Sequence, residues 1–361
     1  MLRLVEYIYI ALLPLNLSLS GIAGRISLIN YIFLLYFILS IIYSSKIINI
    51  RFIKVQPEVS IYFLYALISV LWNHYLLDVS WAGFTFVSSY LIYILFVTKK
   101  RETGYIEIIN NILFTSALFI SIIFIINLTK GEDLFNRYSL SFGNEIDPNY
   151  FVSQLIPINY VLVRNIFEKK FLIPSIMAYF IILFIELFSG SRGGVIANVS
   201  ILVVYIMFKT NSKKIIRTFL IKVVIIFIFI LSIILMIRYI PNWIIVRFMP
   251  GNIIDSNGSG RIHIWTKAIE FFVSQSFLAI MFGNGGFSFP RIAETFLGYR
   301  KYAHNVFIQS LIEGGVIGFL IVLYLYSIIL VKAIKHKNID QLALIVAAII
   351  ASMTLDFNLT R

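Results

Sequence analysis

The chain has 361 residues, of which 60% are hydrophobic and only 13% are charged. A soluble domain is close to a quarter charged, so this composition excludes a soluble globular protein and indicates one whose solvent is lipid. The chain has no cysteine, which excludes a disulfide framework and a thiolate metal site. In a soluble protein the net charge of +13 would favour nucleic acid as a partner, but here the basic residues must first be placed relative to a membrane.

Apolar runs bounded by charge or by Gly and Pro predict eleven membrane-spanning helices, since a helix needs about 20 apolar residues to cross the hydrocarbon core. The runs cover residues 4–19, 26–45, 59–77, 82–98, 105–128, 150–167, 171–188, 194–208, 218–240, 303–331 and 341–357. The first run has no small-residue cleavage site and is read as a retained helix. The expected fold is an all-α polytopic membrane protein of about 11 (10–12) helices, forming one membrane domain over residues 1–361.

Basic residues predict the orientation of these helices. Five alternate connections each hold three to five Lys or Arg, whereas the connection at 73–81 holds none. Short cytoplasmic loops are enriched in Lys and Arg, so we expect a cytoplasmic N-terminus and a large outer loop at 241–302, between helices nine and ten. This assignment accounts for the positive charge without nucleic acid. Within the loop, residues 261–274 carry apolar side chains at the spacing of a helix lying in the interface: Ile262, Trp265, Ile269 and Phe272.

The basic residues expected on the outer face are mostly arginines, which suit bidentate binding of phosphate or carboxylate. They are Arg137, Arg192, Arg247, Arg261, Arg291 and Arg300. The alternative for any one of them is a solvated loop charge that touches lipid headgroups.

Arg192, in FSGSRGGVIANVS, stands at the outer end of a predicted helix among glycines that allow close approach of a ligand. Amides at a helix N-terminus next to an arginine make an anion site. Alternatively, Arg192 snorkels to the interface or pairs with Glu186, a carboxylate inside the preceding helix. Both interpretations remain open at this level.

His304 lies where the outer loop re-enters the membrane, with Asn305 beside it and Glu313 in the following helix. A neutral histidine can accept a proton from a hydroxyl, so His304 is a candidate base; the alternative is a structural hydrogen-bonding group. No spacing of His, Asp or Glu resembles a metal site. The glycines of FGNGGFSF follow no strand and precede no Lys-Ser/Thr pair, so they predict a turn and not a phosphate loop.

Four segments in this order resemble the O-antigen polymerase and O-antigen ligase superfamily of bacterial surface-polysaccharide assembly. They are NRYSLSFGNEIDPNYFVSQL, SGSRGGVIANVS, GRIHIWTKAIEFF followed by FGNGGFSF, and AHNVFIQSLIEGGVIG, and together they span about residues 130–331. Members of the superfamily are similar to the membrane-embedded C-type glycosyltransferases. Relatives commonly have one helix more than the eleven expected here.

The resemblance implies a bacterial cytoplasmic (inner) membrane enzyme whose active site faces the periplasm or exterior. Its implied substrate is an undecaprenyl-diphosphate-linked oligosaccharide, taken without a nucleotide, a cofactor or a required metal. By motif position, His304 is the expected base, while Arg192, Arg261 and, less securely matched, Arg137 are expected to bind the diphosphate. Asn305 and Glu313 are expected to support them. Membrane lipid is a further partner, and a chain-length regulator is left open.

Within the superfamily we expect a polymerase that joins repeat units, with inversion at the anomeric carbon. The nearest alternative is a ligase that transfers the polysaccharide to lipid A core or another acceptor. A second alternative is a polysaccharide flippase or transporter, because intramembrane charges such as Glu186 and Asp356 are common there, although Gly and Pro do not recur at matching midplane positions of two halves. A non-catalytic membrane protein fits poorly with arginines gathered around one His-Asn pair.

Overall fold

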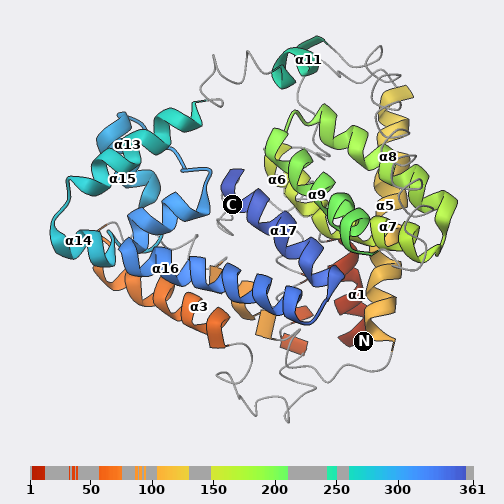
Figure 1. Ribbon diagram of the computed structural model, residues 1–361, viewed down its shortest axis with the longest axis horizontal. Coiled ribbons are helices and arrows are strands. Elements are labelled where there is room, and N and C mark those ends of the chain that lie inside the picture. The colour runs from red at the N-terminus through yellow and green to blue at the C-terminus, as the bar shows by residue number, and fades with distance from the viewer. Residues whose placement is uncertain are drawn as a thin grey trace.

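The computed structural model describes residues 2–12, 57–74, 104–129, 148–209, 242–249 and 260–354, with scattered helical residues between 32 and 39 and between 86 and 94. Within these residues the regular secondary structure is helical throughout (Figure 1). The helices are α1 (Leu2–Leu12), α3 (Pro57–Ser69) with the 3₁₀ turn η2 (Val70–Trp72), α5 (Tyr105–Thr129), α6 (Pro148–Gln154), α7 (Ile156–Glu168), α8 (Leu172–Phe188), α9 (Arg192–Phe208), α11 (Asn242–Phe248), α13 (Arg261–Val273), α14 (Phe277–Phe282), α15 (Phe289–Leu297), α16 (Val306–Lys335) and α17 (Ile339–Thr354).

Most of the longer described helices lie where the sequence predicts apolar helices, whereas α11, α14 and α15 lie in the expected outer loop at 241–302, where only a helix at 261–274 is predicted. Two of the described helices, α5 and α16, are long and apolar enough to cross a membrane, and α3 with η2, α8, α9 and α17 are shorter apolar helices. These helices agree with an all-α membrane protein. The total of eleven spans stays a prediction, because the runs at 26–45, 82–98 and 218–240 lie wholly or mostly outside the described residues.

The run at 150–167, predicted as one helix, is divided into α6 and α7 at Leu155. Pro157 has no amide hydrogen and its ring crowds the carbonyl four residues earlier, so a continuous helix is disfavoured. The chain turns instead through a 3.1 Å hydrogen bond from the Leu155 amide to the Val152 carbonyl. The break lets α6 pack on the first turn of α9, where a Cβ on Gly194 would lie 2.4 Å from Cγ1 of Val152.

Helix α16 is kinked at Gly315, whose φ of 65° and ψ of −165° are not helical. A side chain there would strain this backbone, and its Cβ would lie 2.4 Å from a backbone oxygen of α14. At the kink, two backbone carbonyls of α16 accept hydrogen bonds from amides in the turn after α14. The amide of Asn284 donates to Ile312 O at 3.0 Å, and the amide of Gly285 donates to Glu313 O at 2.9 Å. The predicted glycine turn is therefore confirmed, and its hydrogen bonds stabilise the kink of α16.

Charged residues tie several helix ends together at one end of the molecule. The pairs are Lys332–Glu58 at 2.5 Å, Lys170–Glu107 at 2.6 Å and Lys209–Glu168 at 3.2 Å. Lys332 stands near the end of α16 and Lys209 directly follows α9, so the first residues of α16 and α9 lie at the other end. This agrees with the predicted alternation of helix directions; which side of the membrane each end faces stays a prediction.

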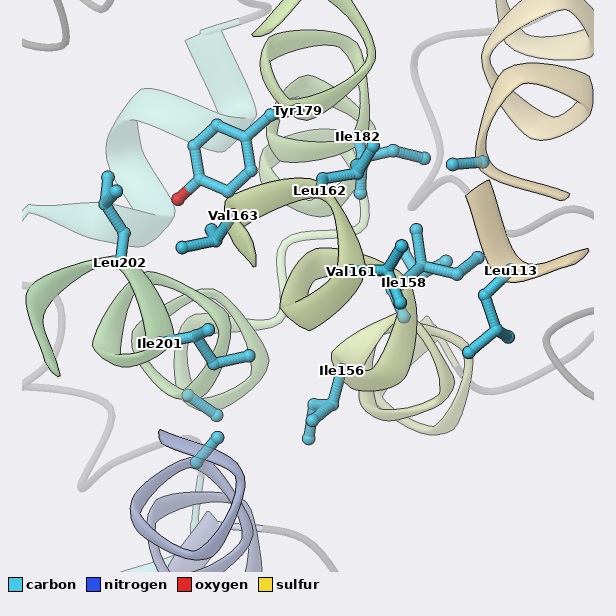
Figure 2. Packing of buried hydrophobic residues seen from close by; sticks show 14 of the residues in the cluster. Leu113, Ile156, Ile158, Val161, Leu162, Val163, Tyr179, Ile182, Ile201 and Leu202 are labelled. Carbon is cyan, nitrogen blue, oxygen red and sulfur yellow. The ribbon is translucent and has the colours of Figure 1, made fainter. Parts of the chain in front are cut away.

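Apolar side chains of α5, α7, α8 and α9 meet in one cluster (Figure 2), where Ile158, Leu162 and Ile182 are fully buried. Lipid is as apolar as these side chains, so close van der Waals packing holds such helices together more than exclusion of water does.

Small residues let α17 approach α9 closely. Ala343, Ala347 and Ala351 recur every fourth residue along α17, and each is fully buried. Gly193 and Ala197, four residues apart on α9, are buried as well. Such small-xxx-small ladders allow two helix backbones to pack side by side in a membrane. Figure 1 shows α17 running between α9 and α16, which brings its C-terminal end toward the first turns of both.

Candidate functional site

The site is built around the start of α16, where the expected base stands. Asn305 is the N-cap: its side-chain oxygen accepts hydrogen bonds from the amides of Phe307 at 3.0 Å and Ile308 at 3.2 Å. His304, one residue earlier, is half-buried and has a left-handed backbone with φ of 52°. Few residues other than glycine adopt this conformation, and those that do are held there by their surroundings. The cap therefore fixes where the helix begins and leaves the histidine outside it.

The end of α17 joins this segment to Arg192. The side-chain amide of Asn305 donates to the carbonyl of Met353 at 3.4 Å. One residue further along α17, Thr354 lies so close to α9 that a Cβ on Gly193 would be 2.0 Å from its Oγ1. The His-Asn segment and the Arg-Gly-Gly segment, far apart in sequence, thus meet at the last two described residues of α17.

Helix α13 brings Arg261 to the same region. Arg261 is the first residue of the helix, after Gly260, whose φ of 78° turns the chain into it. One turn later, the indole N–H of Trp265 donates to the carbonyl of Ala303 at 2.7 Å, directly before His304. Buried residues of α13, α15 and α16 complete the contact in a second apolar cluster. The hydrogen bond between Trp265 and Ala303 therefore fixes the helix that begins at Arg261 against the segment that carries His304.

Arg192 meets a residue that sequence reasoning did not select. Its Nη1 donates to the carbonyl of Arg247 at 3.4 Å, and Nε of Arg247 donates to the carbonyl of Gly190 at 2.7 Å. Arg247 was grouped with the outer arginines, but it follows no motif or spacing that would single it out. This exchange of contacts gathers two guanidinium groups at the start of α9.

Pairing of Arg192 with Glu186, one of the two interpretations of the sequence, is not formed. Oε1 of Glu186 accepts a hydrogen bond from Asn159 at 2.5 Å, and Oε2 has no hydrogen-bond partner among the described residues. The carboxyl group is fully buried. Arg192 thus stands at the first position of α9 without this carboxylate, where the first amides of a helix lack intrahelical partners.

Glu313 stands two turns into α16, before the kink. Its Oε1 accepts hydrogen bonds from the amide of Phe289, at the start of α15, and from the side chain of Gln309, both at 3.0 Å. It therefore joins α15 to α16. Arg137 lies outside the described residues, so its expected binding of the diphosphate stays a prediction. Among the described residues, no group of three His, Cys, Asp or Glu could hold a metal ion together.

This arrangement combines a titratable histidine with arginines and helix-terminal amides at one end of the molecule. Guanidinium groups and helix N-termini bind phosphate oxygens, and a neutral imidazole can take a proton from a hydroxyl. A phosphorylated donor and a hydroxyl-bearing acceptor are the substrates such a site can join.

Residues 177–323 match a protein family described as O-Antigen ligase. The match covers the segments around Arg192, Arg261 and His304, and it confirms the resemblance to the O-antigen polymerase and ligase superfamily. No curated protein and no solved structure shows significant similarity to the chain. The family and the apolar helices together indicate a membrane-bound, glycosyltransferase-like enzyme of surface-polysaccharide synthesis acting on a lipid-linked saccharide.

Proposed function

We propose that this chain, with its O-antigen ligase domain at residues 177–323, is a polysaccharide polymerase that joins undecaprenyl-diphosphate-linked oligosaccharide repeat units on the outer face of the bacterial cytoplasmic membrane. The observation that carries the proposal is the meeting of the His304 and Arg192 segments at the end of α17, with α13 anchored beside them. In the proposal, these three segments supply the base and the diphosphate-binding arginines. The proposed reaction uses no cofactor and no metal ion.

In the proposed reaction, the acceptor hydroxyl oxygen attacks the anomeric carbon of the donor sugar as the bond from that carbon to the diphosphate breaks. The proton of the hydroxyl passes to His304, and the bonding electrons leave with the diphosphate. Positioned general bases contribute about 10²- to 10⁴-fold to rates. Because attack opposite the leaving group reverses the configuration, the product linkage is inverted at the anomeric carbon.

The leaving diphosphate gains negative charge during this step, and Arg192 and Arg261 are the proposed residues that stabilise it. Fixed donors in a poorly hydrated site are effective for this purpose, and losing one typically costs on the order of a hundredfold in rate. Arg247 lies against Arg192 and would hold its guanidinium in place. Arg137, whose motif matches less securely, is proposed to bind the diphosphate as well.

The family match does not distinguish a polymerase from a ligase. In a polymerase the acceptor is another lipid-linked repeat unit, whereas in a ligase it is lipid A core or another surface molecule. The donor half of the site would be the same in both. The experiment must therefore identify the product, because a polymerase and a ligase would both consume the donor.

The test is to delete the gene in its native host and to separate the surface polysaccharide on a gel, with complementation by wild type, His304→Ala and His336→Ala. His336 is the matched control, because it is an exposed histidine in the turn at the far end of α16. We expect deletion to leave single repeat units on the core. Wild type and His336→Ala should restore long chains and His304→Ala should not, while all three proteins insert equally into the membrane.

Other outcomes would contradict specific parts of the proposal. Long lipid-linked polymer that never reaches the core would identify a ligase. Full activity of His304→Ala would remove the histidine from the mechanism, and an unchanged polysaccharide after deletion would overturn the proposed function.

A further inference from the structure

A cavity lies between α3 and α16, beside the His304–Asn305 pair. Its empty volume, with the open space at its mouth included, is about 510 Å³. Figure 1 shows α3 along one side of α16, with α17 on another. Gly314 and Gly318 give the ring of Tyr65 room on the surface of α16, since a Cβ on either would lie 3.0–3.1 Å from the ring.

The cavity begins where the proposed catalytic segment ends. Val306, in the first turn of α16, forms part of its wall, and Gln309 and Glu313 follow at successive turns. Gln309 is only about one turn, ~5.4 Å along the axis, beyond Asn305. A ligand in the cavity can therefore present a group to His304 from the α3 side, while Asn305 binds the end of α17, which in turn lies against Gly193 beside Arg192.

The polar groups of the wall are arranged mainly as hydrogen-bond acceptors. They belong to Tyr62, Tyr65, Ser69, Gln309, Ser310 and Glu313. The hydroxyl of Tyr65 donates to Gly314 O at 2.5 Å, that of Ser69 to Ala66 O at 2.7 Å, and that of Ser310 to Phe307 O at 2.9 Å. Their oxygens still have lone pairs to accept hydrogen bonds from a ligand.

The amide side chain of Gln309 adds to this pattern, because its nitrogen already donates to Glu313 and leaves its oxygen as an acceptor. A wall that accepts hydrogen bonds fits a ligand rich in hydroxyl donors, and the tyrosine rings offer apolar faces to a sugar ring. An isoprenoid chain fits poorly, because it has no donors for these oxygens and would remove them from water.

We propose that this cavity binds the acceptor saccharide, so that His304 stands between the acceptor on the α3 side and the donor diphosphate on the α9 and α17 side. This inference rests on the proposed function and adds to it the place of the acceptor. Because one substrate lies on each side of the start of α16, only the hydroxyl nearest Val306 reaches the histidine. The walls of the cavity thereby select which hydroxyl is glycosylated.

The test compares Ser310→Trp, which fills the cavity, with Ser327→Trp, which adds the same side chain at an exposed position of α16 away from it. The probe is the repeat-unit oligosaccharide released by mild acid from the host's surface polysaccharide. Its binding to purified full-length protein is measured by titration calorimetry, and binding of undecaprenyl diphosphate is measured separately. We expect Ser310→Trp to weaken saccharide binding at least about tenfold, since the indole occupies the space of the sugar.

Undecaprenyl diphosphate binding should be unchanged in both variants, and Ser327→Trp should bind the saccharide like wild type. Equal saccharide binding by Ser310→Trp and wild type would overturn the proposal, as would a wild-type protein that binds no saccharide. A protein that binds the saccharide in a Ser310-dependent way but never extends it would leave the cavity assignment standing and refute the proposed function.

Discussion

Adding one methyl group at Gly193 tests whether α9 and α17 meet as described. A Cβ at this position would lie 2.0 Å from Thr354 Oγ1 and 2.3 Å from its Cβ, whereas ordinary contacts are 3.4 Å or longer. The helices must therefore move apart by roughly 1.4 Å, since both close atoms belong to a short, branched side chain. Overpacking of this kind typically costs about 1–3 kcal/mol of stability.

The same displacement should affect the reaction more than the fold. Thr354 adjoins Met353, whose carbonyl holds Asn305, so a shift of α17 moves Arg192 relative to His304. A misplacement of about 1 Å can lower a rate about a hundredfold. We expect Gly193→Ala to reduce polymer formation by about two orders of magnitude while the protein still inserts and purifies.

The rescue is the decisive measurement. In Gly193→Ala/Thr354→Gly the colliding atoms are absent, so chain length on gels and the melting temperature in detergent should return most of the way to wild type. Thr354→Gly alone serves as the matched control and should stay active. An active Gly193→Ala protein, or a double variant as impaired as the single one, would refute the packing of α9 on α17.

Three further predictions follow from the helix ends. Asn305→Asp keeps the oxygen that caps α16, so this variant should fold normally, but it removes the hydrogen bond to Met353 and should therefore lose activity. Asn305→Ala removes both interactions and should also lower the melting temperature, because losing an N-cap costs about 1 kcal/mol. Lys332→Met should destabilise the purified protein by about 1–3 kcal/mol, and adding Glu58→Gln should reverse most of that loss, because Glu58 is buried against this lysine. The chain has no native cysteine, so an impermeant maleimide should label Tyr299→Cys in intact cells and Lys335→Cys only after permeabilisation; the reverse pattern would invert the predicted topology.

Helical periodicity predicted α13 well, but not the partner of each of its faces. The helix begins at Arg261 as expected, and Ile262 and Ile269 are exposed, on the face expected to meet lipid. Trp265, expected on that face, instead donates to a loop carbonyl, and the buried residues are Ile264 and Ala268. A helix with two apolar faces gives no sign in its own sequence of which face meets protein.

The breaks in the predicted helices could not be read from hydropathy. Pro157 and Gly315 both lie inside apolar runs, and helices in membranes tolerate such residues when a neighbour satisfies the freed backbone groups. At Gly315 the neighbour is the turn at Asn284, which no local pattern connects to α16. Composition therefore located the helices, whereas their interruptions depend on contacts made elsewhere in the chain.

The residues of the candidate site were found by motif, but their meeting point was not. Sequence reasoning named Arg192 and His304, and it gave no role to Met353 and Thr354, which bring their segments together. These four residues share no periodicity, and the helices that carry them are joined only through tertiary packing. The ladder of small residues in α17 was the available signal, because closely spaced small residues mark helix contacts in membranes.

The position of His304 follows from anchors on both sides of it. Before it, Ala303 is held by the indole of Trp265; after it, Asn305 caps α16 and binds Met353. A left-handed backbone at a residue with a Cβ costs roughly 1–2 kcal/mol, so the histidine would leave this conformation if either anchor were lost. One anchor comes from α13, which carries Arg261, and the other from α17, which contacts the Arg192 segment. The base is thus positioned by the same two helices that position the proposed diphosphate-binding arginines, so a displacement of either helix changes the distance between base and leaving group.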